Sequence, residues 1–308
     1  MTTPATRARW AAAITDRAAA HWTPDRTAEF LRGKAVAVPP AEGAVLLRAL
    51  GILDDDGAIP PARVAKYFQV NHVVAQLAPA LRELPGDAIG IVDAGCGRSY
   101  LTTVLAWCGP RLLGRPVRVL GVDRDPDVIA TSAHRAALAG LDEQVRHVAA
   151  PLESLDVRAA WAAAHGGTID AVVALHACDT ATCAAIGLGV ELGAGLIAVA
   201  PCCQAELARG WAELAEAGAT GPLAPLWNAP HLRRETAAEI TDLMRLLLLR
   251  AAGYRATALE FVPHEHTRKN TLLRATRDRA DPEAARQYAA LVATTGGVGL
   301  ALARRLGC

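Results

Sequence analysis

Residues 89–101 read IGIVDAGCGRSYL, and this stretch decides how the chain folds. An apolar strand ends in Asp93 and breaks into a turn that contains Gly95 and Gly97. A dinucleotide-binding turn needs a third glycine, which brings the start of its helix close to a pyrophosphate. The third-glycine position is Tyr100 here, so the turn predicts a site for a nucleoside with ribose hydroxyls and no pyrophosphate.

A second apolar segment, VRVLGVDRD at residues 117–125, ends in Asp123. In open α/β sheets, ligands bind beyond the carboxyl ends of the strands. Asp123 is therefore placed to accept hydrogen bonds from both ribose hydroxyls, and Asp93 to hold an amino group of the ligand. Strand-terminating acids can also be ordinary turn residues, but the neighbouring glycines favour the binding interpretation.

Strands and helices alternate through the rest of the chain. Strands are expected near 88–93, 117–123, 145–149, 170–176, 196–201, 255–262 and 271–276, with helices over 62–84, 99–107, 126–139, 180–192 and 235–252. This alternation predicts an α/β fold with a Rossmann-like, seven-stranded, mainly parallel sheet. The last two strands are separated by a short loop and should form an antiparallel hairpin at one edge. Residues 1–60 read as a small helical N-terminal region, a lid or platform, before a main domain at 61–308.

Five short sequence motifs together resemble those of a branch of the class I methyltransferases, which use S-adenosylmethionine (SAM). They are KYFQVNH at 66–72, DAGCGRSYLT at 93–102, HACDTAT at 176–182, APCCQ at 200–204 and EHTRKN at 265–270. The resemblance covers residues 62–278 and implies a SAM-dependent methyltransferase, but it does not fix the acceptor. A terminal β-hairpin is also characteristic of the class I sheet.

This resemblance, with the strand ends, gives a set of predicted SAM contacts. They are Lys66, Gln69, His72, Asp93, Gly95, Cys96, Gly97, Tyr100, Asp123, Arg124 and His176. The polar residues at 66–72 could instead form a solvated helix face. The third strand ends in HVAAPLESL at 147–155 and lacks the acid that meets the adenine amino group in many relatives.

Methyl transfer to an amine or hydroxyl also requires removal of a proton. By position, the candidates for the base are His176, Asp179 and His266, and histidine is favoured because its pKa lies near neutrality. Asp179 could instead cap the helix that starts at residue 180.

Cys178, Cys202 and Cys203 could gather with His176 at the ends of the fourth and fifth strands. Zinc is disfavoured because two adjacent cysteines cannot easily ligate one ion and no C-x-x-C spacing occurs. Cysteines that line the pocket as small apolar residues are the expected alternative, and no metal is predicted.

Overall charge bears on the acceptor. The chain has 32 basic and 31 acidic residues, a net charge of +1, which argues against a large nucleic-acid footprint. Basic segments at 231–234, 267–269 and 274–279 could still form a local apron for tRNA or rRNA. The balance slightly favours a small-molecule acceptor. An enzyme that uses SAM without methylating, or a non-catalytic SAM-binding module, are further alternatives.

The chain is expected to be soluble and cytoplasmic, without a membrane partner. It has no apolar run of signal-peptide or membrane-spanning length, and its seven cysteines have no disulfide-scaffold spacing. The acceptor atom, the oligomeric state and the role of residues 1–60 are left open by the sequence.

Overall fold

The computed structural model describes residues 3–175, 179–260 and 270–308. The chain divides into two compact units, residues 1–168 and 169–308. In the seven-stranded sheet the strands follow the order β3-β2-β1-β4-β5-β7-β6. The units do not divide near residue 60, and the predicted boundary there stays a prediction.

The first unit contains three parallel strands, in the order β3-β2-β1. They are β1 (Ile89–Ala94), β2 (Val117–Asp123) and β3 (Val145–Ala149). The helices are α1 (Pro4–His21), α2 (Pro24–Leu31), α3 (Ala44–Ala49), α4 (Pro61–Glu83), α5 (Tyr100–Cys108), α6 (Pro126–Leu138) and α7 (Val157–Ala164), with a π-helical turn η1 (Gly109–Leu113) after α5. Every residue of β1 is buried, as expected for a strand covered on both faces.

The helix starts in this unit follow capping chemistry. The Asp125 side chain accepts hydrogen bonds from the N–H groups of Asp127 and Val128, and Pro126 occupies the first helical position of α6. Thr3 and Thr23 cap α1 and α2 in the same way, each before a proline. The predicted cap at Asp125 is confirmed.

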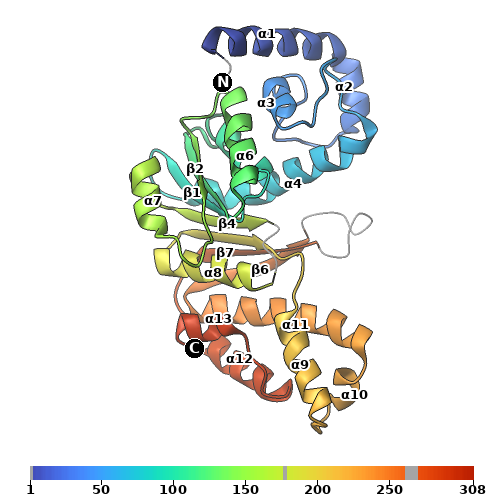
Figure 1. The fold of residues 1–308 in the computed structure, drawn as a ribbon, viewed down its shortest axis with the longest axis vertical. Helices are drawn as coiled ribbons and strands as arrows, with labels where there is room; N and C mark the ends of the chain where they lie inside the picture. The colour runs from blue at the N-terminus through green and yellow to red at the C-terminus, as the bar shows by residue number, and fades with distance from the viewer. Residues whose placement is uncertain (1–2, 176–178, 261–269) are drawn as a thin grey trace. The chain divides into compact units, whose positions relative to one another are not determined.

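The second unit holds four strands. They are β4 (Ala171–Leu175), β5 (Leu196–Ala200), β6 (Tyr254–Glu260) and β7 (Thr271–Arg277). β4 and β5 are parallel, β7 is antiparallel to β5, and β6 pairs with β7 (Figure 1). The helices are α8 (Thr180–Leu192), α9 (Glu206–Glu216), α10 (Ala224–Trp227), α11 (Pro230–Ala251), α12 (Pro282–Thr294) and α13 (Ala301–Leu306).

The predicted α/β fold, with a mainly parallel sheet and an antiparallel C-terminal hairpin, is confirmed. All seven strands lie within two residues of the expected ranges. The sequence patterns missed α7, α9, α10, α12 and α13. Among the described residues, no helix is both long and apolar enough to span a membrane.

Candidate active site

The turn after β1 has the backbone conformation that its glycines permit. Gly95 and Gly97 have φ angles of 76° and 51°, and Ser99 follows at 54°, a left-handed region that side chains with a Cβ disfavour. The N–H groups of Gly95 and Cys96 donate to the carbonyl of Val122, at 2.8 and 2.9 Å. A Cβ on Gly97 would meet no atom within 4 Å, so the space above this residue is open to a ligand.

Asp123, at the end of β2, holds this turn directly. Its Oδ2 accepts a hydrogen bond from the N–H of Gly97 at 2.9 Å, and its Oδ1 accepts from the N–H of Asp125 at 3.1 Å. A carboxylate offers about four lone-pair sites. Asp123 therefore keeps acceptor capacity for two further donors.

Asp93 is 2% exposed at the end of β1, and the hydroxyl of Thr102 donates to its Oδ2. Burial, opposed by the Thr102 hydrogen bond and aided by the charge of Asp123, raises the pKa of Asp93 to about 7. A buried carboxylate of this kind is stabilised by a cation. Among the described residues, none forms an ion pair with Asp93.

His147 on β3 supports the same turn, which the sequence did not predict. Its Nε2 lies 2.9 Å from the hydroxyl of Ser99, and burial lowers the pKa of His147 to about 4, so the ring is neutral at physiological pH. Gly121 leaves room for the ring, since a Cβ there would lie 2.9 Å from His147 Cδ2 and 3.0 Å from Cys96 Sγ. Burial also raises the pKa of the Cys96 thiol, which therefore stays neutral.

The helix α4 brings two of its three predicted polar residues together. Lys66 Nζ donates to Gln69 Oε1 at 3.2 Å and lies 4.7 Å from the centre of the Tyr100 ring. Burial lowers the pKa of Lys66. His72 is exposed and lies 3.3 Å from the side-chain nitrogen of Gln76, so the structure does not group it with Lys66.

The remaining predicted residues are spread more widely. Arg124 is exposed next to Asp123. His176 and Cys178 lie outside the described residues, as does His266. Among the described residues, no group of three or more His, Cys, Asp or Glu side chains could hold a metal ion.

Asp179, at the start of α8, has both carboxylate oxygens engaged. Oδ1 accepts from the N–H groups of Ala205 and Glu206 at 2.8 and 2.9 Å, and Oδ2 pairs with Arg209 at 2.9 Å. Burial alone would raise the pKa of Asp179, but these hydrogen bonds and the guanidinium hold it below its ordinary value. Asp179 occupies the N-cap position of α8, but its side chain makes no capping hydrogen bond to that helix. These contacts favour a structural role, and the general-base assignment stays a prediction.

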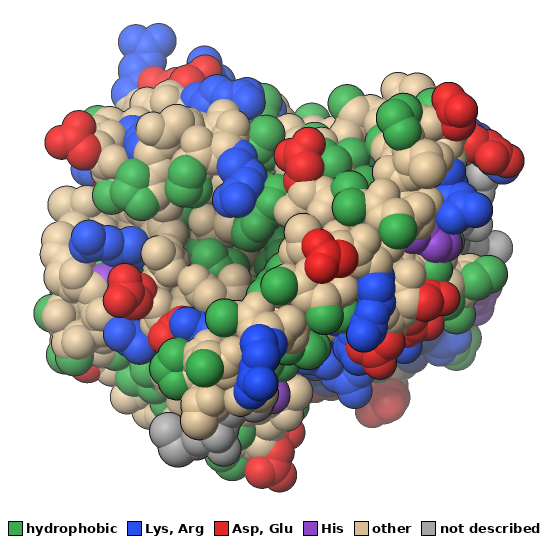
Figure 2. All heavy atoms as spheres, turned by 90° about the horizontal axis from the view of Figure 1, so that it is seen from above, with side chains coloured by type: hydrophobic (Ala, Val, Ile, Leu, Met, Phe, Trp, Pro, Cys, Tyr) green, Lys and Arg blue, Asp and Glu red, His purple; other side chains and the backbone are tan. Residues whose placement is uncertain are grey.

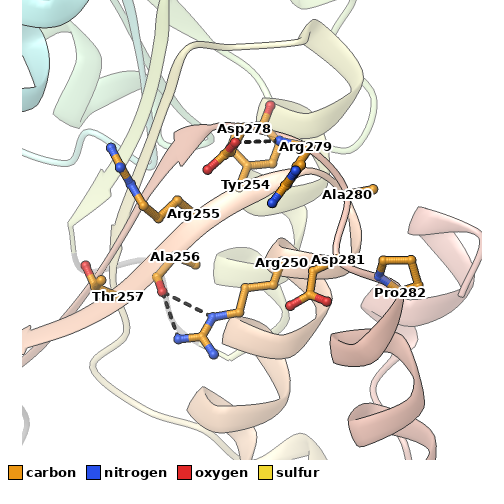
Figure 3. A pocket seen from close by; sticks show the side chains of 10 residues that line it. All are labelled: Arg250, Tyr254, Arg255, Ala256, Thr257, Asp278, Arg279, Ala280, Asp281 and Pro282. Carbon is orange, nitrogen blue, oxygen red and sulfur yellow. Dashed lines mark hydrogen bonds between the residues drawn. The ribbon is translucent and has the colours of Figure 1, made fainter.

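A cavity of about 640 Å³ lies in the second unit. Arg250, Arg255 and Arg279 are among the residues that line it (Figure 3). In the register of β5 and β7, Leu196 lies opposite Thr276 and Val199 opposite Leu273. The cavity beyond β7 is therefore at the amino end of β5, whereas ligands of such sheets bind at the carboxyl ends.

Comparison with known proteins gives one family match and several structural likenesses. Residues 65–210 match a family described as a methyltransferase domain. The comparison with curated proteins found no match.

Solved structures with a similar fold were also found. A methyltransferase of Podospora anserina bound to S-adenosylhomocysteine is 14% identical, with 83% of this chain and 95% of that chain covered and a TM-score of 0.44. Cofactor-bound Rv0187 from MTB is 20% identical, with 83% and 98% covered and a TM-score of 0.43. An rRNA methylase of Streptococcus thermophilus is 15% identical, with 67% and 96% covered and a TM-score of 0.40.

The family match spans the glycine turn after β1 and the ends of both β4 and β5. The order of the seven strands and the acids that end β1 and β2 agree with it. Residues 65–210 therefore match a methyltransferase domain, and together with the fold this match indicates a SAM-dependent methyltransferase.

Proposed function

We propose that the chain transfers the methyl group of SAM to a nucleophilic nitrogen or oxygen of a small-molecule acceptor. The observation that carries the cofactor assignment is the buried Asp93 beside the open glycine turn. A carboxylate that is 2% exposed, with a pKa of about 7, fits an ammonium group such as that of the methionine part of SAM. The residues present therefore fit the cofactor.

In this proposal each residue of the first unit has a separate task. Asp93 holds the amino group, and Asp123 accepts from the ribose hydroxyls with the lone pairs that Gly97 and Asp125 leave unused. Gly95 and Gly97 let the backbone approach the ligand. Lys66 and Gln69 on α4 are the candidates for the carboxylate of the methionine part, with Tyr100 beneath them. Cys96, His72 and Arg124 remain predicted contacts.

When bound, SAM supplies a methyl carbon attached to a sulfonium, which a lone pair on the acceptor displaces directly. The protein has to align the reactants and exclude water, since orientation supplies much of the rate. An amine or hydroxyl acceptor also gives up its proton to a base. His176 and His266 stay as candidates, and they are preferred over Asp179 because its oxygens are already engaged.

The distribution of charge supports a small acceptor over RNA. Of the three basic segments, residues 274–279 run toward the amino end of β5, where Arg277 donates to the carbonyl of Gly193 at 3.0 Å. This segment therefore does not lie at the carboxyl end of β5. Figure 2 shows acidic and basic side chains interspersed over the visible face, without a broad basic patch.

The test is incubation with methyl-labelled SAM and fractionated metabolites, RNA and protein from a host lysate. We expect the label in the metabolite fraction together with S-adenosylhomocysteine as the product. Label in RNA would replace the small-molecule assignment by an RNA methyltransferase. Methylthioadenosine as the product would indicate transfer of the aminobutyrate chain of SAM, and SAM binding without turnover on any pool would indicate a non-catalytic module.

A further inference from the structure

In the second unit, the start of α8 and the loop after β5 are joined by a set of buried and half-buried polar side chains. We call Asp179, Gln204, Asp242 and Arg245 the β4–β5 clamp. Asp179 follows the end of β4, Gln204 follows the end of β5, and the other two lie one turn apart on α11. Ligands of open α/β sheets bind beside such strand ends, so contacts that fix the start of α8 and the loop after β5 also fix that part of the site.

Arg245 forms the buried half of the clamp. It is 0% exposed, and its guanidinium donates to Asp242 Oδ1 at 2.9 Å, to the carbonyl of Asp179 at 2.8 Å and to Cys183 Sγ at 3.4 Å from two nitrogens. Asp242 in turn accepts from Gln204 at 2.8 Å. One turn of α11 therefore contacts both the start of α8 and the loop after β5, and the buried charge of Arg245 is paired, as burial requires.

Asp179 forms the other half of the clamp. Its N–H donates to the carbonyl of Cys203 at 2.9 Å, while its Oδ1 receives the N–H groups of Ala205 and Glu206 at the start of α9. Its backbone has a φ of 50° and a ψ of −114°, a conformation that is costly for a residue other than glycine. Strain of this kind persists only where surrounding contacts hold it, and Asp179 has hydrogen bonds on its N–H, its carbonyl and both carboxylate oxygens.

We propose that Asp179 and Arg245 are positioning residues for methyl transfer, which hold the start of α8 and the loop after β5 in the arrangement that receives the acceptor. The proposal rests on the proposed function for its kinetic readout. Asp179 acts here through the backbone N–H groups that it binds. A general base would act instead through its own charge and a free oxygen.

Two substitutions of Asp179 separate these roles. Asp179→Gly accepts the backbone conformation without strain but removes the acceptor for Ala205 and Glu206. Asp179→Asn keeps an oxygen at that position and, with a side chain of the same shape, leaves the backbone strain as it is in the wild type. We expect Asp179→Gly to lower kcat/KM for the labelled acceptor fraction by about tenfold or more, and Asp179→Asn by about threefold or less.

Three further readouts complete the kinetic test. The pH profile of Asp179→Asn should match that of the wild type, and the Kd for SAM should change by about twofold or less in both variants, because the proposed SAM contacts of the first unit are untouched. Glu216→Gln, at an exposed carboxylate on α9, is the matched control. If Asp179→Asn is as inactive as Asp179→Gly, or loses one limb of the pH profile, Asp179 acts as a base and the proposal is overturned.

Arg245 is tested by Arg245→Lys and Arg245→Met. The lysine keeps one donor for Asp242 but loses the fork that also reaches Asp179 and Cys183. We expect both variants to raise the KM for the acceptor fraction with the Kd for SAM unchanged, and Arg245→Lys to be the milder one. Equal KM values for both variants and the wild type would contradict the proposal.

Hydrogen exchange tests the clamp without any acceptor. In Asp179→Gly the amides of Ala205 and Glu206 should exchange about tenfold or more faster, while in Asp179→Asn they stay protected. Should the wild type transfer no label to any pool, the proposed function fails and this exchange result alone decides the clamp. Unchanged exchange in Asp179→Gly overturns it.

Discussion

At the scale of single residues, Asp93 and Asp123 differ because their surroundings differ. Asp93 is enclosed at the end of β1, and Asp123 lies at the rim of the sheet with one oxygen on the N–H of Gly97. The first is suited to pair with a cation, and the second to accept hydrogen bonds from neutral hydroxyls. Both roles follow from the strand ends that the sequence predicted.

Asp123→Ala should raise the Kd for SAM by about thirtyfold or more, because it removes the acceptor of the Gly97 N–H as well as the proposed ribose contact. Isothermal titration calorimetry measures this change. Asp87→Ala, at an exposed acid before β1, serves as the control and should bind like the wild type. An unchanged Kd for Asp123→Ala would remove β2 from the binding site.

The affinity for SAM should depend on pH through Asp93. Its pKa of about 7 without ligand means that the carboxyl becomes neutral as the pH falls and can no longer pair with an ammonium. The Kd should therefore rise by about fivefold between pH 7 and pH 6. In Asp93→Asn the binding of SAM should be weaker, and its Kd should no longer depend on pH in this range. If the Kd of this variant still changes with pH, a group other than Asp93 is responsible.

The stability of the ligand-free protein should change in the opposite sense. Because folding raises the pKa of Asp93 from 3.8 to about 7, the folded state binds more protons than the unfolded state between these values. This contribution to the free energy of unfolding is present below pH 4 and is lost as the pH rises through 7. Urea unfolding of the wild type and of Asp93→Asn from pH 5 to 8 measures it as the difference between the two slopes.

At the scale of elements, two strand glycines of the first unit are packed so closely that a larger residue would collide with their neighbours. A Cβ on Gly121 of β2 would meet the side chains of His147 and Cys96. A Cβ on Gly90 of β1 would lie only 2.1 Å from the backbone oxygen of Thr168. Close packing of this kind transmits strain, because a buried strand has little room to shift. The turn after β1 is therefore closely packed against β2, since Cys96 of the turn lies next to Gly121.

Gly121→Ala should lower the free energy of unfolding by about 1–3 kcal/mol, since the ring of His147 and the sulfur of Cys96 have to move. Gly90→Ala should cost more, because backbone cannot move as a side chain can. Urea unfolding of both variants measures which of them loses more free energy of unfolding. A smaller loss for Gly90→Ala than for Gly121→Ala would contradict the packing around β1.

At the scale of the whole molecule, the near balance of 32 basic and 31 acidic residues bears on the acceptor. Binding to RNA through six to ten phosphates would weaken by roughly 10³-fold or more between 50 and 200 mM salt. We expect kcat/KM for the metabolite fraction to change by about threefold or less over that range. A steep loss would favour a nucleic-acid acceptor and point to basic side chains near the strand ends.

The alternation of apolar runs with capped helices was readable locally, and it placed all seven strands. The helix α12 also carried the signal used for α6, an aspartate followed by a proline at residues 281 and 282, and so could have been found. Gly95, Gly97, Asp93 and Asp123 were readable because a turn and the ends of two strands determine their positions.

The sequence by itself therefore determined the fold class, the nature of the cofactor and the residues at the first two strand ends. Only the tertiary structure brought His147 to Ser99, 48 positions apart, and Arg245 to Asp179, 66 positions apart. Such contacts depend on which elements pack together and how deeply each group is buried, and no local pattern encodes either. For the same reason the raised pKa of Asp93 and the engaged oxygens of Asp179 became visible only in the folded chain.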